Sequence, residues 1–588
     1  MILLTKYSLI FLLIVSPILQ AQKLSSFEVT GSSDFSEADY IQWSGLRLDQ
    51  TYFKGILDSA KSRISNKLIN NGYYFFKYLN DEIKFSEDSL SFSIKINLNE
   101  GTPVIVKNIF LEGLDSLWNI EVENQFSFLE GQIFNKDDFE NELENILKKF
   151  EDSGYPFTKI IISSFDVYQD SLNDDNYADI YLKFENGTIS KIDKVEIIGN
   201  TSTKDYVIVR ELRIAPGEVY SQKKIDEFPN RLNRLRFFEP VSNPSYYINS
   251  KNEGVLQIDV KEKNTNNFDG IIGYIPPDNN GSSGYITGLV NISLRNLFGT
   301  GRAASINWNK YNRSSQELDL RYLEPWIFSF PVNVNLNLYQ KIQDSSYVQR
   351  RFIISVDYLA TEDISAGVFL STESVVPTAR VVHVFTVYNS SYLNTGITLK
   401  IDTRDDPYSP TSGIVFINTY EYSSKTINGP EEYITPTTVT SYSLQRLMAS
   451  FYFYHEIFSK QVLAYGINGK ELKGPTFEES ELYTLGGFST LRGYREQQFL
   501  GSRIAWSNLE YRFLFSRRSF GFVFFDTGYY LRPADESQNI PRSEAFLFGY
   551  GLGLNIETGI GVLGVSYALG KGDTFSEGKI HFGILNEF

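Results

Sequence analysis

The sequence contains no cysteine and only two methionines among its 588 residues. Without thiols the chain cannot form a disulfide-stapled scaffold, a thiolate metal site, a cysteine nucleophile or a diacylated N-terminal cysteine. Positive charge is also scarce, because 55 basic residues face 71 acidic ones and the formal net charge is −16. This balance argues against a nucleic-acid binder, which needs a basic surface to displace counterions from phosphates.

Long apolar runs are missing beyond the first residues of the chain. No later stretch approaches 18 consecutive apolar residues, and the mean hydropathy is −0.22, which excludes a helical membrane transporter. The one apolar run, Tyr7 to Leu19, follows Lys6 and precedes Ala21. It is shorter than the roughly 20 residues that span a bilayer as a helix. Residues 1–21 are therefore predicted to be a secretory signal peptide, with an uncleaved anchor as the alternative.

Aromatic residues are abundant, with 45 Phe and 38 Tyr, and the chain divides into two unlike halves. The first half holds most of the net negative charge and repeats itself about every 80 residues. Three helix-period segments end in an aromatic corner, at residues 68–76, 150–157 and 232–240, and a strand-like run follows each, at residues 90–101, 177–187 and 254–263. The predicted unit is β-α-α-β-β, three times, over residues 23–100, 101–187 and 188–264.

The third unit shows the pattern most clearly. Residues 194–198 alternate like an amphipathic strand, and Gly199-Asn200 forms a turn. Thr201 or Ser202 is expected to cap a helix that runs through Arg210, and a second helix is expected from Gln222 to Leu235. These three units resemble POTRA domains, the periplasmic modules that precede outer-membrane barrels in assembly and translocation factors. An unrelated small α+β repeat is the alternative.

The second half, residues 266–588, consists of short alternating runs separated by Gly, Asn, Ser and Pro clusters. Apolar residues at positions 332, 334, 336 and 338 alternate with Asn333, Asn335, Asn337 and Tyr339, for example. Any one such strand would also fit a soluble sandwich. Across the whole half, with aromatic ends at 324–330 and 450–458, the pattern predicts a transmembrane β-barrel with a polar lumen.

Periodicity marks 17 candidate strands in this half. A bacterial barrel needs an even number of strands, and the length suits 16, so one candidate must be a loop. The segment from Arg380 to Asn389, next to Pro377, is the predicted loop. The predicted fold is therefore three N-terminal α+β repeats followed by a 16-stranded antiparallel transmembrane β-barrel.

A long segment from Glu471 to Ser502 carries the most specific motif, GGFSTLRGYREQQFLG, at residues 486–501. Loops of this length are usually functional or disordered. The core of the motif, Leu491, Arg492, Gly493 and Tyr494, resembles the Val/Leu-Arg-Gly-Tyr/Phe motif of BamA, TamA and two-partner secretion transporters. The resemblance implies that this loop folds back into the barrel and that Arg492 meets acidic residues on the inner wall. Glu510 and Asp526 match the acidic positions, and a solvated loop arginine is the alternative.

Other segments resemble the same family, so the resemblance covers the chain from about residue 190 to its end. They are residues 296–302, 321–328, 402–413 and 548–561. The end of the sequence resembles the outer-membrane C-terminal signal, with a final Phe588 and Gly583 five residues before it. Asn586 departs from the usual aromatic residue at its position. The family is that of BamA/TamA-type outer-membrane protein assembly factors, and the layout is closest to TamA.

Enzymatic and cofactor chemistry finds little support in the sequence. The three histidines, His383, His455 and His581, are far apart, and no metal-binding histidine spacing occurs. The glycines of Gly549-Tyr550-Gly551-Leu552-Gly553 alternate as in a strand, which favours barrel packing over a phosphate-binding loop. No Gly-x-Ser-x-Gly motif is present. The expectation is a protein that is not an enzyme and has no cofactor.

The family resemblance implies an outer-membrane protein with periplasmic POTRA domains that inserts or exports other proteins. Unfolded outer-membrane or exported proteins and the lipid bilayer are the expected partners, nucleic acid is not, and an inner-membrane or accessory protein remains open. The first barrel strand holds Gly270 and Gly273 and is expected to meet the last strand, which holds Gly583 and Phe588, at a weak lateral seam. The alternatives are a two-partner secretion transporter with one dedicated passenger and a passive porin.

Overall fold

The computed structural model describes residues 22–585, except 89, 171–174, 276–284, 311, 344–345, 379–384, 407–408, 535–539 and 559–560. The expected signal peptide and Phe588 therefore lie outside the described residues. The described chain forms two compact units. The first holds the chain up to Val195 with Ala215–Glu227 and Tyr246–Leu256, and the second holds Glu196–Ile214, Phe228–Ser245 and the chain from Gln257 onward.

The first repeat packs two helices on a three-stranded sheet of order β1-β3-β2. Residues Phe92, Ile94, Ile96 and Leu98 alternate inward along β3 and meet Ile56, Ala60, Ile64 and Leu68, which are spaced four residues apart along α2. These periods of two and four define the two faces that form its core. Its elements are β1 (Lys23–Thr30), α1 (Glu37–Ser44), α2 (Ile56–Asn70), β2 (Lys77–Phe85) and β3 (Ser91–Asn99).

The second repeat has the same element order and the same sheet order, β4-β6-β5. In both repeats the first and last strands are parallel neighbours and the middle strand pairs antiparallel with the last. Phe139, Ile146 and Phe150 of α4 pack on the inward residues of β6. Its elements are β4 (Val104–Glu112), α3 (Ser116–Phe126), α4 (Lys136–Asp152), β5 (Lys159–Gln169) and β6 (Asn176–Glu185).

The third repeat contains a sheet of order β10-β11-β8, so its last strand is again central. Its elements are β7 (Lys191–Ile192), β8 (Lys194–Ile198), α5 (Asp205–Leu212), β9 (Glu218–Val219), α6 (Gln222–Asp226), α7 (Phe228–Leu235), β10 (Ser245–Ile248) and β11 (Gly254–Asp259). The β-α-α-β-β prediction agrees with the first two repeats, and the third repeat follows the same order with two additional two-residue strands, β7 and β9, and a divided second helix. The domain limits drawn from the sequence remain predictions.

Two local predictions for the third repeat were wrong. The single helix expected from Gln222 to Leu235 is broken at Glu227, because Pro229 has no N–H with which to continue the hydrogen-bond ladder. The N-cap of α5 is Lys204, which makes no side-chain cap, rather than Thr201 or Ser202. The Thr201 hydroxyl and the Ser202 amide instead donate hydrogen bonds to Glu262.

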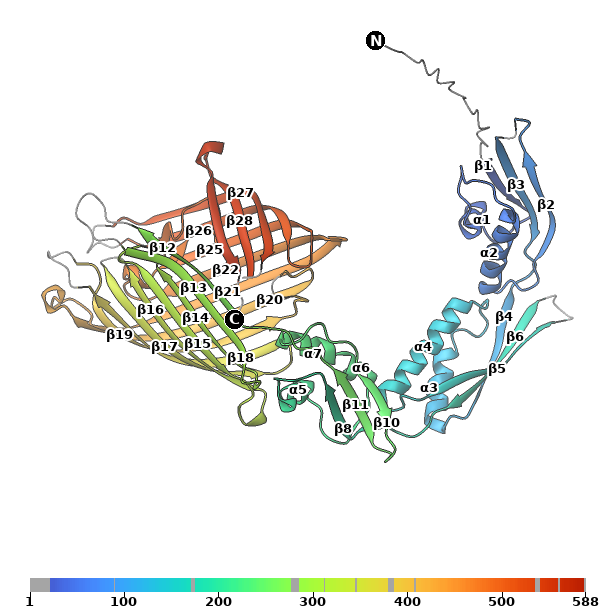
Figure 1. The fold of residues 1–588 in the computed structure, drawn as a ribbon, viewed down its shortest axis with the longest axis horizontal. Helices are drawn as coiled ribbons and strands as arrows, with labels where there is room; N and C mark the ends of the chain where they lie inside the picture. Colours follow the sequence, from blue (N-terminus) through green and yellow to red (C-terminus); the bar gives the residue numbers. More distant parts are fainter. Residues whose placement is uncertain are drawn as a thin grey trace, which may run out of the picture. The chain divides into compact units, whose positions relative to one another are not determined.

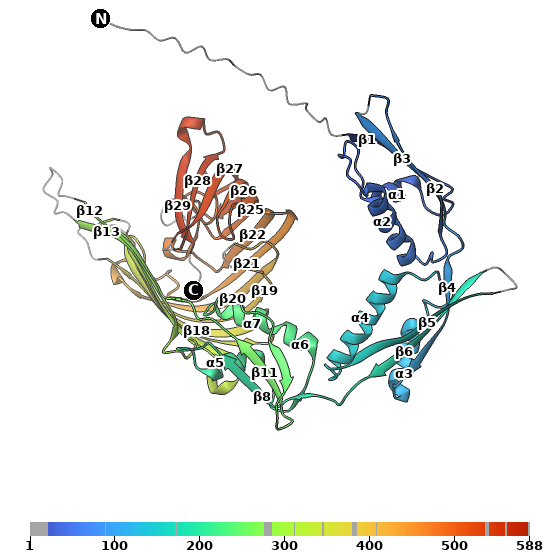
Figure 2. The same cartoon turned by 45° about the vertical axis from the view of Figure 1, so that its right-hand side comes forward.

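The second half forms a curled antiparallel sheet of 16 strands, each paired with its neighbour in sequence (Figures 1 and 2). The strands are β12 (Asn267–Ile275), β13 (Tyr285–Leu297), β14 (Arg302–Lys310), β15 (Gln316–Glu324), β16 (Val332–Gln343), β17 (Tyr347–Leu359), β18 (Ile364–Pro377), β19 (Asn389–Asp402), β20 (Gly413–Gly429), β21 (Ser441–Phe458), β22 (Gln461–Lys473), β25 (Arg503–Leu514), β26 (Phe520–Arg532), β27 (Ser543–Thr558), β28 (Gly561–Gly570) and β29 (Lys579–Leu585).

The strand count agrees with the sequence prediction of 16. The rejected candidate, Arg380 to Asn389, lies partly outside the described residues, and its described residues 385–388 are irregular. Asn389 itself begins β19.

One face of the sheet is apolar and exposed, and the other is polar. On β17, Phe352, Ile354 and Val356 are each about two-fifths exposed, whereas Asp357 accepts a hydrogen bond from Asn335 of β16. The polar face is called the inner face from here on. The alternation therefore places the polar residues of neighbouring strands on one face of the sheet, as a barrel with a polar interior requires. Among the described helices, none is long and apolar enough to cross a bilayer.

The two ends of the sheet are β12 and β29, and within their described residues neither is paired with the other. β12 pairs only with β13, and β29 pairs with β28 from Val562↔Leu585 to Ala568↔Lys579. Figure 2 shows β12 and β29 apart from each other, at the two ends of the curled sheet.

Candidate functional site

The segment between β22 and β25 folds onto the inner face of the sheet. It contains two short paired strands, β23 (Tyr483–Leu485) and β24 (Phe499–Gly501). Leu485 and Leu491 are fully buried against Ile504 and Trp506 of β25. The segment from residue 474 to residue 502 is called the inner loop below. Its apolar contacts bring the Leu-Arg-Gly-Tyr motif close to the wall.

Arg492 lies between the two acidic residues that the sequence singled out. Its Nη1 lies 2.7 Å from Glu510 Oε1 on β25, while Nη2 and Nε donate to the two Asp526 oxygens on β26 at 2.7 and 2.8 Å. The guanidinium carbon also lies 3.7 Å from the centre of the Phe524 ring. Arg492 is 5% exposed and Asp526 is fully buried. A bidentate pair of this kind needs the planar fork of arginine, which lysine lacks.

The backbone of the motif is fixed as well. The Arg492 amide donates to Asp526 Oδ2 at 3.1 Å, and the Tyr494 hydroxyl donates to the Phe548 carbonyl at 3.1 Å. Gly493 has φ +92°, and an added Cβ would lie 2.7 Å from the Leu569 carbonyl. Glycine is therefore required here for both conformation and space. All four motif residues that the sequence singled out contact the wall strands.

Two residues of β29, His581 and Gly583, also contact the inner loop, although Gly583 was predicted to lie at the lateral seam and neither was predicted to lie at this site. His581 of β29 accepts a hydrogen bond from the Gly493 amide at 3.2 Å, although the histidines were considered only as metal ligands. A Cβ added to Gly583 would lie 2.2 Å from the Phe488 ring. His581 and Gly583 share one face of β29 because they are two residues apart. For His581, the two-residue period of the strand is the signal in the sequence that places it on the same face as Gly583.

Glu510 has a second cationic partner. Arg512, two residues further along β25, lies 2.8 Å from Glu510 Oε2, so one carboxylate bridges two guanidinium groups. The Arg512 guanidinium also lies over the Phe520 ring, 4.8 Å from its centre. The wall therefore balances the charge brought in by Arg492.

The predicted seam residues do not come together in the structure. Gly270 and Gly273 face β13, where an added Cβ would approach Leu289 and Thr287 at 3.1 Å. Gly583 faces the inner loop, and Phe588 lies outside the described residues. The seam therefore remains a prediction about these strands.

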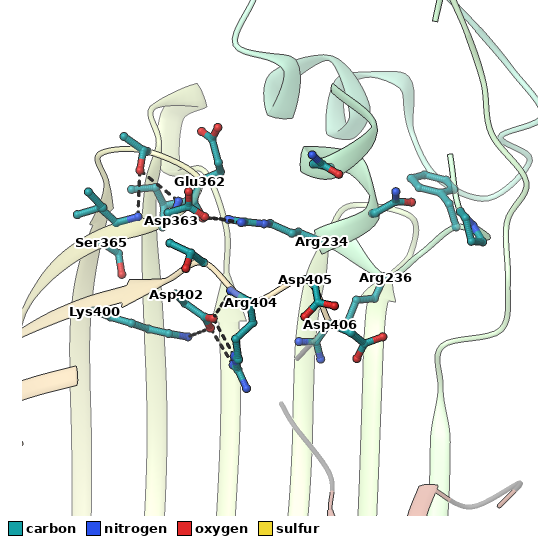
Figure 3. A pocket seen from close by; sticks show the side chains of 18 of the residues that line it. Arg234, Arg236, Glu362, Asp363, Ser365, Lys400, Asp402, Arg404, Asp405 and Asp406 are labelled. Atoms are coloured by element: carbon teal, nitrogen blue, oxygen red, sulfur yellow. Dashed lines mark hydrogen bonds and ion pairs between the residues drawn. The ribbon is translucent and has the colours of Figure 1, made fainter. Parts of the chain in front are cut away.

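A charged cavity of about 590 Å³ lies where residues of the third repeat meet the sheet within the second unit (Figure 3). Arg234 pairs there with Asp363, and Asp402 lies between Arg404, at 2.8 Å, and Lys400, at 3.4 Å. Seven basic and five acidic side chains line the cavity, so charges of both signs face it. The described residues contain no group of three or more His, Cys, Asp or Glu placed to hold a metal ion.

Comparison with known proteins identifies both halves of the chain. Residues 296–588 match the family model described as the Omp85 superfamily domain. Residues 22–101 and 190–263 match the POTRA model, described as the surface antigen variable number repeat. These matches cover the first repeat, the third repeat and most of the sheet.

Among curated proteins, the chain is similar to two named outer membrane protein assembly factor BamA. With that of Neisseria meningitidis serogroup B it is 22% identical over 366 residues, which cover 60% of this chain and 44% of the relative. With that of Nitratidesulfovibrio vulgaris it is 23% identical over 534 residues, which cover 84% of this chain and 62% of the relative. The chain thus spans about half the length of these relatives.

Two solved structures are similar in part. BamA from Haemophilus ducreyi lacking POTRA domains 1–3 superposes with a TM-score of 0.49 at 18% identity, covering 82% of this chain and 98% of that one. CdiB from Acinetobacter baumannii superposes with a TM-score of 0.46 at 14% identity, covering 93% and 96%.

Proposed function

The chain belongs to the Omp85 superfamily, and from this membership we propose that it inserts other proteins into the outer membrane or translocates them across it. Omp85 proteins are assembly and transport factors, not enzymes, which agrees with the sequence expectation. In this proposal the sheet spans the outer membrane as a barrel and the repeats lie in the periplasm. The proposed partners are unfolded outer-membrane or exported proteins and an accessory or inner-membrane protein.

The edges of the repeat sheets support a role in receiving clients. On the side of β4 that faces away from β6, Val104 and Val106 form backbone hydrogen bonds with residues 132–134. This edge of the sheet is therefore already covered. β2 and β5 form the opposite edges of their sheets. An unfolded strand can extend such an edge through backbone hydrogen bonds, so we propose β2 and β5 as the client-binding edges.

The observation that carries the proposal is the unpaired state of β12 and β29 in their described residues. A porin barrel requires complete backbone pairing because lipid offers no hydrogen-bond partners. An assembly factor instead needs a seam where client strands pair before they enter lipid. The glycines of β12 weaken this strand, which favours opening there.

Client identity distinguishes the three candidate functions. The experiment is depletion of the protein followed by quantitative proteomics of the outer membrane. The proposal expects loss of many different barrel proteins. Loss of one exported protein would establish a two-partner secretion transporter instead, and an unchanged proteome would support a passive porin.

A further inference from the structure

A basic residue of the wall contacts the inner loop far along the sheet from the site of Arg492. Lys425 lies on β20, where Glu421, Ser423 and Lys425 follow one another on the inner face. The Lys425 side chain is 0% exposed. Lysine is almost never fully buried unless its ammonium group is paired, so its partners must compensate the charge.

The partners of Lys425 are two carboxylates at the start of the inner loop. Its Nζ donates to Glu481 Oε1 at 2.7 Å and also to Glu478. The rings of Tyr392 and Tyr442 lie 5.4 and 5.2 Å from Nζ, which completes a cage around the cation. This ammonium group therefore joins the wall to loop residues more than 50 positions further along the chain.

The two carboxylates are themselves held in place. The Tyr392 hydroxyl on β19 donates to Glu481 Oε1 at 2.8 Å, and the Tyr388 amide donates to Glu478 Oε2 at 2.8 Å. The Glu478 amide donates to Glu481 Oε2 at 2.9 Å. Glu478 and Glu481 are 7% and 5% exposed. Two buried carboxylates this close repel each other unless a cation lies between them.

We propose that Lys425 is a positioning residue that anchors the first part of the inner loop, residues 474–485, to β19 and β20. Arg492 anchors the second part, residues 486–501, to β25 and β26. The strands β21 and β22 separate the two walls in the sheet order, so the loop is fastened at two separate places. The anchor concerns how the loop is held against the wall. It rests on the proposed function only for the expected effect on client insertion.

Hydrogen exchange of the full-length protein, folded in detergent or nanodiscs, tests the anchor. In a Lys425→Met variant, amides in residues 474–485 should exchange about tenfold faster or more, while residues 486–501 keep their protection. The matched control is Lys473→Met. Lys473 lies directly before the same loop, and its side chain is 62% exposed. This variant should leave both segments unchanged. Unchanged exchange in residues 474–485 of Lys425→Met would overturn the proposal, as would equal loss of protection in both segments.

A neutral variant separates loss of charge from loss of packing. Lys425→Met combined with Glu478→Gln and Glu481→Gln removes the buried charges together and should fold even if the single variant does not. It should restore much of the protection of residues 474–485, because no carboxylate is left uncompensated. If the triple variant exchanges as fast as Lys425→Met, the electrostatic anchor is wrong.

Client insertion into liposomes provides a functional readout on the same variants. Lys425→Met should insert a test barrel protein more slowly while its own barrel stays folded by heat-modifiable gel mobility, and the triple variant should recover. Faster loop exchange with unchanged insertion would support the anchor and would show that client insertion does not depend on it.

Discussion

Arg492 joins two strands of the wall through one guanidinium group, so its removal leaves the fully buried Asp526 without its cation, whereas Glu510 keeps Arg512. Breaking a buried ion pair from one side costs about 3–5 kcal/mol, because the remaining charge is uncompensated. We therefore expect Arg492→Ala to lower the free energy of unfolding by this amount, measured by denaturant titration in detergent.

The matched control is Arg503→Ala, at the end of the same loop. Arg503 pairs with Glu471 at 2.8 Å, but its side chain is 56% exposed. Exposed pairs contribute about 0–1 kcal/mol. Equal destabilisation by the two variants would contradict the burial argument.

Gly549 permits a close approach of the inner loop to β27. A Cβ added there would lie 1.9 Å from the Arg492 carbonyl oxygen, a distance that no rotamer change can relieve. Gly549→Ala is expected to displace the loop and to increase hydrogen exchange in residues 486–501. Gly469→Ala is the control, because nothing lies within 4 Å of its added Cβ. An unchanged loop in Gly549→Ala would show that β27 itself can move.

Among single residues, the sequence predicted those that belong to a short continuous motif. Leu491 to Tyr494 form a continuous motif, and Glu510 and Asp526 occupy motif positions of their own. Lys425 lies 53 and 56 residues before its partners, and no spacing rule connects them. Only the curl of the sheet brings these charges together, so sequence patterns could not predict the second anchor.

The elements of the chain follow periodicity, and they differ from prediction where a single residue overrides it. Alternation marked 17 candidate strands, because each strand presents one apolar face, and the even strand number of bacterial barrels together with the length reduced them to 16. Helical periodicity predicted one helix from Gln222 to Leu235, whereas Pro229 divides this segment into two helices. The expected cap by Thr201 or Ser202 failed because Glu262, about 60 residues further along the chain, accepts hydrogen bonds from both residues.

Glu262 makes the turn before α5 sensitive to pH. Burial alone would raise the pKa of Glu262, but hydrogen bonds from Thr201, Thr203 and Ser202 lower it from 4.5 to about 2. Because the folded pKa lies below the ordinary value, the carboxylate stabilises the fold above about pH 4.5, and this stabilisation is lost as the pH falls toward 2.

The measurement is the unfolding free energy of the wild type and of Glu262→Gln at several pH values. The difference between the two proteins should be largest near neutral pH and should shrink below pH 4.5. Glu239→Gln, which removes an exposed partner of Lys261, should differ little from wild type throughout. A difference for Glu262→Gln that does not depend on pH would exclude the carboxylate as its cause.

For the whole molecule, the absence of cysteine gives a clean background for cross-linking. One cysteine introduced into β12 and one into β29 would be the only thiols, so any disulfide reports on the two ends of the sheet. If client strands enter lipid between these ends, the oxidised protein should lose client insertion and the reduced protein should regain it. A cysteine pair across β13 and β14, which are already paired, is the control. Full activity of the oxidised β12–β29 protein would remove the seam model.

The order of the strands also has a kinetic consequence. Of the fifteen strand pairs in the sheet, fourteen join strands that follow one another directly in the chain, and the fifteenth joins β22 to β25 across the inner loop. Such local contacts close with little loss of chain entropy. Contact between β12 and β29 would join residues near 270 and near 580, the most distant pairing available to the sheet. During folding this contact should form after all the others, so the chain would pass through an open, nearly complete sheet that resembles the arrangement in Figure 2.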